Sequence, residues 1–239
     1  MPDPILVAQP VQLALGVSLP DHIGFDNFLP GPNVFALNSL RDVISRSGFN
    51  CVYLWGSSQS GKTHCLQAAC NFLAAKFPVV YIPGRQFAAK SAAILHGMEN
   101  QQLVCLDDLE AVCGLGEWER GLFNLYNQLQ ENRGLLCVSA EANLEQIGIH
   151  LPDLKSRLHA GLNLRLYPLS DDEKVQALYQ RCKSRGIDIP PESVEFVLKR
   201  RSRDLASLYS FIDQLIERAI TQQRRLTIPF IKEHWSSEK

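Results

Sequence analysis

The stretch GSSQSGKT at residues 56–63 constrains the fold of this chain more than any other part of the sequence. It follows the apolar run CVYLW and precedes the helical stretch THCLQAACNFLAAKF. A glycine-rich loop that ends in Lys-Thr, between a buried strand and a helix, matches the complete G-x-x-x-x-G-K-[ST] pattern of a phosphate-binding loop. The sequence therefore predicts an α/β domain in which this loop connects a buried strand to a helix.

The same loop predicts a binding site for a polyphosphate. We expect Gly56 and Gly61 to let successive backbone N–H groups point inward, where the N-terminus of the next helix adds to the cradle. Lys62 is then expected to reach the β- and γ-phosphates, and the Thr63 hydroxyl to hold Mg²⁺. The alternative is a glycine turn followed by a chance Lys-Thr pair. The expected nucleotide-binding residues of this stretch are Gly56, Ser57, Ser58, Gln59, Ser60, Gly61, Lys62, Thr63 and His64.

A second motif is LVCLDD at residues 103–108, which reads as an apolar strand that ends in two carboxylates. Such a strand end is common at turns, but beside a phosphate-binding loop on a neighbouring strand it is the expected acidic partner. We expect Asp107 to hold Mg²⁺ through water and Asp108 to orient the attacking water.

The pattern from residue 50 onward alternates between apolar runs and helical stretches, which predicts a parallel five-stranded sheet flanked by helices. The runs are apolar throughout, as in strands that are covered on both faces. They occupy residues 51–55, 79–82, 103–106, 134–138 and 162–166. The helical stretches between them occupy residues 62–76, 85–96, 117–132 and 150–158.

After Pro168 the pattern becomes entirely helical. The capping box Ser-Asp-Asp-Glu at 170–173 opens a helix to about residue 185, and helices follow at about 191–200 and 203–222. We therefore expect three parts, namely an extended arm at 1–20, an α/β nucleotide-binding domain at 21–168 and a small helical domain at 169–239.

Composition excludes several classes of protein. Residues 1–173 hold 11 Lys/Arg against 17 Asp/Glu, and residues 174–239 hold 13 against 8. The basic third is either a nucleic-acid footprint or a set of helices with solvated polar faces, and we favour the second. The seven cysteines form no CxxC pair, which indicates reduced thiols without a disulfide frame or a zinc site. No apolar run has the length of a membrane span, and the proline-containing N-terminus is a poor signal peptide.

The order of these motifs resembles that of the AAA+ ATPases and, among them, the DnaA branch of bacterial replication initiators. GKTHCLQA, LVCLDD, LPDLKSRL and a later RSRDLASL carry the resemblance, together with FDNFLPGPN at 25–33, and it covers roughly residues 21–235. It implies bound ADP or ATP with Mg²⁺, a C-terminal lid domain, and Phe28 and Asn33 as base-contacting residues. It also implies that Arg203 reaches the phosphates from the lid, with Arg201 as the alternative.

Two departures narrow the resemblance to the Hda type of DnaA-related regulators. DnaA initiators carry a C-terminal DNA-binding domain, for which we expect no room in this chain, and extra helical residues where this chain has only HGMENQ. Hda-type proteins also bind the DNA polymerase sliding clamp near their N-terminus. Here Gln12, Leu13 and Leu15 form a short segment that fits an apolar groove, and the alternative is an arm that packs on its own core.

Arg157, in the stretch DLKSRL at 153–158, matches the arginine-finger position of the DnaA branch. A finger neutralises charge on the γ-phosphate in the next subunit and raises the hydrolysis rate by about 10³–10⁵. The alternative is a surface arginine at a helix C-terminus, favoured by the helix dipole.

The resemblance is weakest where the chain's own hydrolysis is concerned. At the end of the strand GLLCV, the polar Ser-Asp pair typical of DnaA is replaced by Ser139 and Ala140. Asp108 is also one methylene shorter than the Glu of vigorous AAA+ ATPases. Both features indicate at most weak intrinsic ATPase activity.

The resemblance as a whole implies a regulator of chromosome replication initiation. It would be nucleotide-bound, tethered to the sliding clamp, and would stimulate ATP hydrolysis by the DnaA initiator through Arg157 in trans. Such a protein is expected in the bacterial cytoplasm, associated with the nucleoid through the clamp, without strong direct DNA binding and with self-association left open. Two alternatives remain: a self-contained ATPase that acts as a helicase loader or DNA remodelling factor, and a clamp-bound adaptor whose nucleotide only stabilises the fold.

Overall fold

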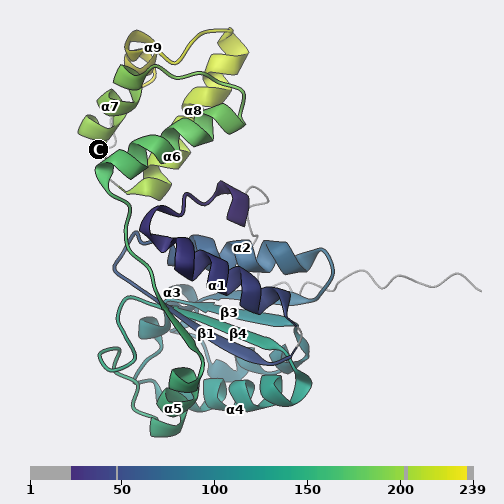
Figure 1. Cartoon of the computed structure of the whole chain (residues 1–239). Helices are drawn as coiled ribbons and strands as arrows, with labels where there is room; N and C mark the ends of the chain where they lie inside the picture. Colours follow the sequence, from purple (N-terminus) through teal and green to yellow (C-terminus); the bar gives the residue numbers. More distant parts are fainter. Residues whose placement is uncertain (1–22, 47, 202–203, 236–239) are drawn as a thin grey trace, which may run out of the picture. The chain divides into compact units, whose positions relative to one another are not determined.

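Figure 1 shows the computed structural model of the chain, which describes residues 23–46, 48–201 and 204–235. The chain forms two compact units that divide between Pro168 and Leu169, and each is described by itself. None of the helices in these described ranges is both long enough and apolar enough to cross a membrane.

The first unit is built on a five-stranded parallel sheet with the strand order β2-β3-β4-β1-β5. The predicted fold class, a parallel five-stranded sheet between helices, is confirmed. The strands are β1 (Asn50–Trp55), β2 (Val79–Pro83), β3 (Leu103–Asp107), β4 (Leu135–Ala140) and β5 (Leu162–Arg165).

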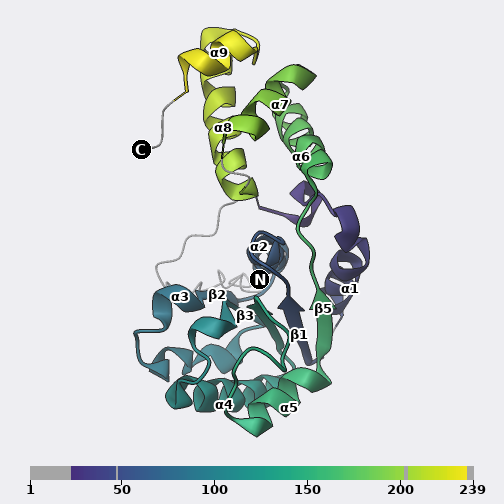
Figure 2. The ribbon, with the colours of Figure 1, turned by 90° about the vertical axis from the view of Figure 1, so that its left-hand side faces the viewer.

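Helices cover both faces of this sheet, as Figures 1 and 2 show from two directions. Helices α1 (Val34–Ser45) and α2 (Lys62–Ala74) lie on one face, and α4 (Gly116–Asn132) and α5 (Pro152–Ala160) lie on the other. Short 3₁₀ turns complete the unit: η1 (Phe25–Asn27), η2 (Gly31–Asn33), η4 (Met98–Asn100) and η5 (Leu109–Ala111).

The strands send alternate side chains to the two faces. In β1, Val52 and Leu54 are buried in the core on the side of α1 and α2, whereas Cys51 and Tyr53 are buried on the side of α4 and α5. Because water reaches neither face, every position of such a strand is apolar, which explains the uninterrupted run CVYLW.

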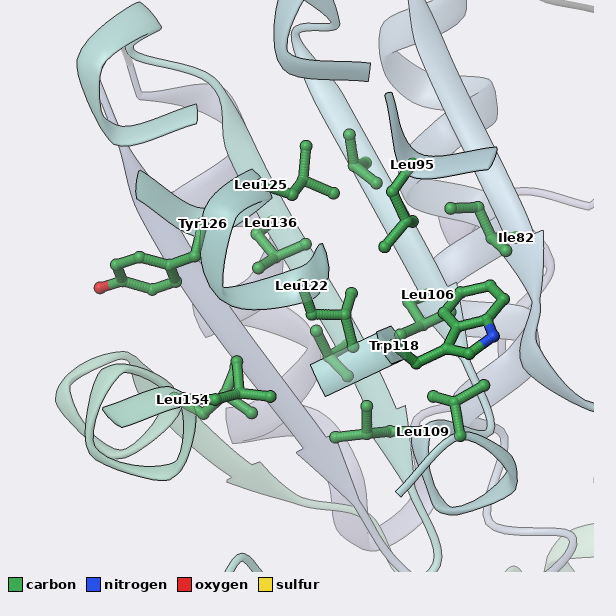
Figure 3. Packing of buried hydrophobic residues seen from close by; sticks show 14 of the residues in the cluster. Ile82, Leu95, Leu106, Leu109, Trp118, Leu122, Leu125, Tyr126, Leu136 and Leu154 are labelled. Atoms are coloured by element: carbon green, nitrogen blue, oxygen red, sulfur yellow. The ribbon is translucent and has the colours of Figure 1, made fainter. Parts of the chain in front are cut away.

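Helix α4 is anchored on the sheet by one apolar face. Trp118, Leu122 and Leu125 recur every three or four residues, so they share one side of the helix. They are buried in one cluster with Leu106 of β3 and Leu136 of β4, as Figure 3 shows. The position of α4 on the sheet is therefore determined by close packing.

One predicted position in the sheet is wrong. The acidic strand β3 is not a neighbour of β1, because β4 lies between them: Val138 of β4 pairs with Tyr53 of β1 on one side and with Leu106 of β3 on the other. The carboxylates at the end of β3 therefore face the end of β4, and residues of β4 stand between them and the glycine loop.

The predicted helix at 85–96 is also wrong. The structure has a one-turn helix α3 (Gly84–Phe87) and, after a break, the 3₁₀ turn η3 (Ala92–Leu95). Ser91 causes the break, because its backbone is extended and its side chain accepts a hydrogen bond from the N–H of Ala93. A serine in this position caps a new turn instead of continuing the old one.

The second unit is helical. It contains α6 (Asp171–Ser184), α7 (Pro191–Arg200), α8 (Leu205–Gln222) and α9 (Ile228–Glu233). Both hydrogen bonds of the predicted capping box are present between Ser170 and Glu173 at the start of α6. Helix α9 was not predicted, since six residues are too few for a clear helical period, and burial of Phe230 and Ile231 holds it in place.

Candidate functional site

The loop after β1 passes so close to its neighbours that its first residue must be glycine. Gly56 donates its N–H to the carbonyl oxygen of Ala140, at the end of β4, with a distance of 3.1 Å. A Cβ atom on Gly56 would lie 2.2 Å from the carbonyl oxygen of Leu166, just beyond β5. Any side chain there would push the loop away from the strands that hold it.

The second glycine of the loop carries a different constraint. Gly61 has a φ angle of +93°, which L-residues with side chains rarely adopt, and it is the N-cap of α2. A Cβ atom on Gly61 would lie 2.7 Å from the ring of Phe28. Helix α2 has no side-chain cap at this end, so its first N–H groups are available to an anion.

Lys62 lies inside the loop. Its side chain is buried, and its Nζ donates to the carbonyl oxygens of Gly56 (2.7 Å) and Ser57 (3.0 Å). The hydroxyl of Ser60 is also buried here, and it has no hydrogen-bond partner among the described residues. A buried ammonium near an unpaired hydroxyl and free helix N–H groups suits a polyphosphate, because phosphate oxygens would add negative charge beside Lys62 and give the hydroxyl and the N–H groups partners.

The segment before α1 lies against this loop. The Phe28 ring meets the His64 ring edge to face at a centroid distance of 5.2 Å. His64 Nε2 lies 3.0 Å from the carbonyl oxygen of Gly24. The structure therefore brings Phe28 to the glycine loop from a segment about thirty residues earlier, and its contact with a base stays a prediction.

Asn33 has another position. It is buried, its Nδ2 donates to the carbonyl oxygen of Tyr167 (2.9 Å), and its Oδ1 accepts from the N–H of the same residue (2.8 Å). Both ends of the amide thus bind one backbone segment beyond β5, which favours a structural role over direct contact with a base.

The carboxylate of Asp107 is buried and held on two sides. One oxygen accepts from the Tyr81 hydroxyl of β2 (2.6 Å), and the other accepts from the Ser139 hydroxyl of β4. Ser139 Oγ in turn accepts from the N–H of Asp108 (3.1 Å), so it joins both acidic residues to β4. Burial and the negative charge of Asp107 raise the pKa of Tyr81 well above its usual value, so the phenol remains a donor.

These residues fit an indirectly held Mg²⁺. Each oxygen of Asp107 already accepts one hydrogen bond and keeps capacity for a metal-bound water, and Thr63 is exposed in the first turn of α2. In the described part of the chain, no three His, Cys, Asp or Glu side chains gather as a protein-only metal site. A magnesium ion here would therefore take its remaining ligands from phosphate oxygens and water.

Asp108 is tied to an arginine that the sequence analysis did not single out. Arg85 Nε donates to Asp108 (2.9 Å), and its Nη2 donates to Glu110 (3.2 Å) and Glu141 (2.9 Å). One guanidinium, which follows β2, therefore binds three carboxylates that follow β3 and β4. Burial raises the pKa of Glu110, and the negative charges of Asp108 and Glu141 add to that shift. The position of Arg85 two residues after the strand VVYIP was the available sign in the sequence.

Arg157 lies near the C-terminal end of α5 and is exposed. Its guanidinium lies 5.6 Å from the centroid of the Tyr126 ring, and no carboxylate of the described residues pairs with it. By contrast, Lys155 and His159 on the same helix both bind Glu145, at 2.6 and 2.8 Å. Among these three side chains of α5, Arg157 is thus the one without a carboxylate partner in the described residues.

The start of α5 is held by a buried carboxylate from α4, which the sequence analysis also missed. Glu119 accepts from the N–H groups of Gly114 (2.7 Å), His150 (3.0 Å) and Leu151 (2.7 Å). Burial by itself would raise the pKa of Glu119, but these N–H groups and His150 lower the pKa below its usual value. Nothing in the local sequence marks this residue, because two of its three partners, His150 and Leu151, lie about thirty residues later.

Arg201 lies in an aromatic cluster of the second unit. Its guanidinium lies 3.9 Å from the Phe211 ring centroid and 5.5 Å from that of Trp235. The other expected lid residue, Arg203, lies outside the described residues. So do the expected clamp-binding residues Gln12, Leu13 and Leu15.

Two protein-family models match the chain. The model of the bacterial DnaA ATPase domain matches residues 19–165, and the model of the lid domain of Hda matches residues 171–234. Together these matches cover most of both structural units.

Solved structures agree with this fold. Domain III of the Thermotoga maritima replication initiation protein DnaA has a TM-score of 0.74 and 20% identity, covering 90% of this chain and 97% of that chain. AMPPCP-bound DnaA from Aquifex aeolicus has a TM-score of 0.69 and 20% identity, covering 82% and 66%. The Thermotoga maritima RuvB Holliday junction branch migration motor has a TM-score of 0.57 and 15% identity, covering 82% and 67%.

The Glu119 contacts predict a pH-dependent stability. Because the folded-state pKa lies below the ordinary value, the carboxylate stabilises the fold above about pH 5, and this stability is lost as the pH falls through the folded pKa. Glu119→Gln should lower the free energy of unfolding by about 1–3 kcal/mol at pH 7. In denaturant unfolding, the difference from wild type should shrink between pH 5 and pH 3.

The matched control is Glu117→Gln, which removes the same charge from the same helical turn. Glu117 accepts only from the exposed Ser91 hydroxyl among the described residues, so its effect on unfolding should be small. If the difference in unfolding free energy between wild type and Glu119→Gln does not change with pH, the lowered pKa is wrongly assigned to Glu119.

Proposed function

The chain belongs to the bacterial DnaA ATPase family of AAA+ proteins and has a lid domain of the Hda type, and from that premise we propose how it regulates replication initiation. In this proposal the chain holds ADP or ATP, docks on the ATP-loaded DnaA initiator and stimulates hydrolysis of the initiator's ATP through Arg157. The initiator's own site supplies the reacting water, and this chain supplies a positive charge.

The observation that carries this proposal is that the cationic side chains of α5 differ in whether a carboxylate binds them. Glu145 binds both Lys155 and His159, while Arg157 projects from the surface over the Tyr126 ring without a carboxylate partner in the described ranges. An exposed guanidinium held against a ring keeps all its N–H donors for a phosphate and needs little ordering when it binds.

The proposed nucleotide site consists of the glycine loop, Lys62 and the start of α2. We assign the loop N–H groups and Lys62 to the phosphates, Thr63 and Asp107 to Mg²⁺, and Phe28 to the nucleoside side of the loop. In support, the glycine loop carries a buried ammonium and an unpaired hydroxyl. The Aquifex aeolicus DnaA of the same fold was solved with AMPPCP bound. In this proposal Asn33 has an indirect role. Its hydrogen bonds to the backbone of Tyr167 hold the segment that carries Phe28 in place.

We propose that Arg203 completes this site from the lid, and not Arg201. The guanidinium of Arg201 packs on Phe211 and Trp235, so it already has a structural role in the second unit. Arg203 follows two residues later in the sequence, immediately before Asp204, which is the N-cap of α8.

The chain's own hydrolysis is proposed to be weak. The carboxylate expected to orient the attacking water belongs to Asp108, and Arg85 binds one of its oxygens. The polar residue expected at the end of β4 is also absent, because Ala140 stands there. The site is therefore better suited to holding a nucleotide than to turning it over.

The first experiment tests Arg157. Arg157→Ala should lower the single-turnover rate of ATP hydrolysis by the initiator, with the clamp on DNA, by on the order of 10³, because the transition-state charge loses its counter-charge. Lys155→Ala removes a positive charge from the same helix and should change the rate by less than about threefold. Stimulation by Arg157→Ala equal to wild type would rule out the finger.

The second experiment tests Arg85. An exposed ion pair is worth about 0.2–1 kcal/mol, so Arg85→Ala should release Asp108 and raise the chain's own ATP turnover by up to about fivefold. Arg46→Ala, which removes an exposed pair with Asp42, serves as the control and should leave turnover unchanged. If Arg85→Ala turns over ATP no faster than wild type, the pair does not restrain Asp108.

The third experiment tests the tether. We propose that Gln12, Leu13 and Leu15 bind an apolar groove on the sliding clamp. Gln12→Ala with Leu13→Ala should weaken binding to purified clamp at least tenfold in a binding titration, since two anchor side chains are lost. The control is Gln9→Ala, a substitution in the same N-terminal segment, which should bind the clamp as tightly as wild type does. Equal affinity of all three proteins would exclude this segment as the tether.

A further inference from the structure

Helix α5, which carries Arg157, has no side chain of its own that caps its N-terminus. It has nine residues and no side-chain cap, because its N-cap residue is Leu151. A helix this short is not stable by propensity alone and depends on tertiary contacts.

Glu119 of α4 supplies the missing cap from outside the helix. Its Oε2 accepts from the N–H of Leu151 at 2.7 Å and from that of His150 at 3.1 Å, and its Oε1 accepts from His150 at 3.0 Å and from Gly114 at 2.7 Å. The side chain of Glu119 is only 3% exposed, so these bonds form away from water, where a carboxylate is costly unless it is fully hydrogen-bonded.

The same face of α4 also supports the arginine itself. Tyr126 is seven residues after Glu119, which is two helical turns and therefore the same side of the helix. Its ring lies beneath the Arg157 guanidinium at 5.6 Å. Between these two points, Leu154 and Leu158 of α5 are buried in the core that α4 shares, and Figure 3 shows Leu154 in that cluster.

We propose that Glu119 is a positioning residue that holds the start of α5 on the rigid helix α4 and thereby sets the direction in which Arg157 is presented. This inference rests on the proposed function of Arg157. Because α4 is fixed on the sheet by Trp118, Leu122 and Leu125, we expect loss of the Glu119 contacts to shift the start of α5 and not α4, and to change the direction of Arg157 with it. A displacement of about 1 Å in a catalytic constellation costs on the order of 10²-fold in rate.

The test uses the full chain with Glu119→Gln, whose amide group faces the backbone N–H groups with a donor of its own. The maximal rate of stimulated single-turnover hydrolysis should fall about 10- to 100-fold, while the concentration for half-maximal stimulation and the affinity for ADP stay near wild type. Amide hydrogen exchange at His150 and Leu151 should become faster. Glu117→Gln is the control for the charge of that helical turn and should change none of these values.

A double mutant separates positioning from a general loss of stability. If Glu119 acts through Arg157, adding Glu119→Gln to Arg157→Ala should lower the rate no further, because the interaction it serves is already gone. If instead each substitution lowers the rate by its own factor and the two factors multiply in the double mutant, the proposal is wrong. A maximal rate for Glu119→Gln within twofold of wild type when Arg157→Ala is defective would also overturn it.

The outcomes also distinguish this inference from the proposed function. If Arg157→Ala stimulates as well as wild type, the finger is wrong, and hydrogen exchange at His150 and Leu151 still decides whether Glu119 holds α5. Should Glu119→Gln fail to fold, Glu119→Asp keeps the charge one methylene short. It should give an intermediate rate with faster exchange at the same two amides, and wild-type values for both would overturn the proposal.

Discussion

The packing of β1 between β4 and β5 is the constraint on which the rest of the first unit depends. It leaves no room for a side chain where the strand turns into the loop, so the chain can leave β1 only through Gly56. The loop is therefore held by the strands on both sides, and Lys62 is brought back over its carbonyl oxygens. Because all five strands are parallel, the ends of β2, β3 and β4 lie at the same edge as this loop, which is how residues distant in sequence share one site.

The same edge contains two kinds of polar contact. Buried, fully hydrogen-bonded groups such as Asp107, between Tyr81 and Ser139, are fixed in one geometry, which suits the holding of an ion. The exposed Arg85 and the half-buried Asp108 form an ion pair at the surface, which is individually weak and which a substitution or a bound molecule can rearrange. This combination is consistent with the proposal that the site retains a nucleotide and hydrolyses it only weakly. Arg157 belongs to α5, on the face of the sheet that α4 and α5 cover, where Tyr126 of α4 supports it.

Much of this fold was predictable because its signals are local. The strand, loop and helix around GSSQSGKT are contiguous, and uninterrupted apolar runs identify strands that are covered on both faces. The errors arose where local signals are ambiguous or absent. The run at 85–96 has helical spacing, but Ser91 interrupts it through a side-chain hydrogen bond. The strand order also placed β4 between β1 and β3, and sequence spacing contains no information on order within a sheet.

By itself, the sequence determined the phosphate-binding loop, the acidic strand end, the helical C-terminal unit and the resemblance that indicated the family, because each is a pattern within a short stretch of chain. Only the tertiary structure decided what those residues touch. It paired Arg85 with Asp108, turned the amide of Asn33 toward the backbone of Tyr167, and brought Glu119 to the start of the helix that carries Arg157. Such contacts join residues tens to more than a hundred positions apart, and they exist only because burial of the two faces of the sheet brings those segments together.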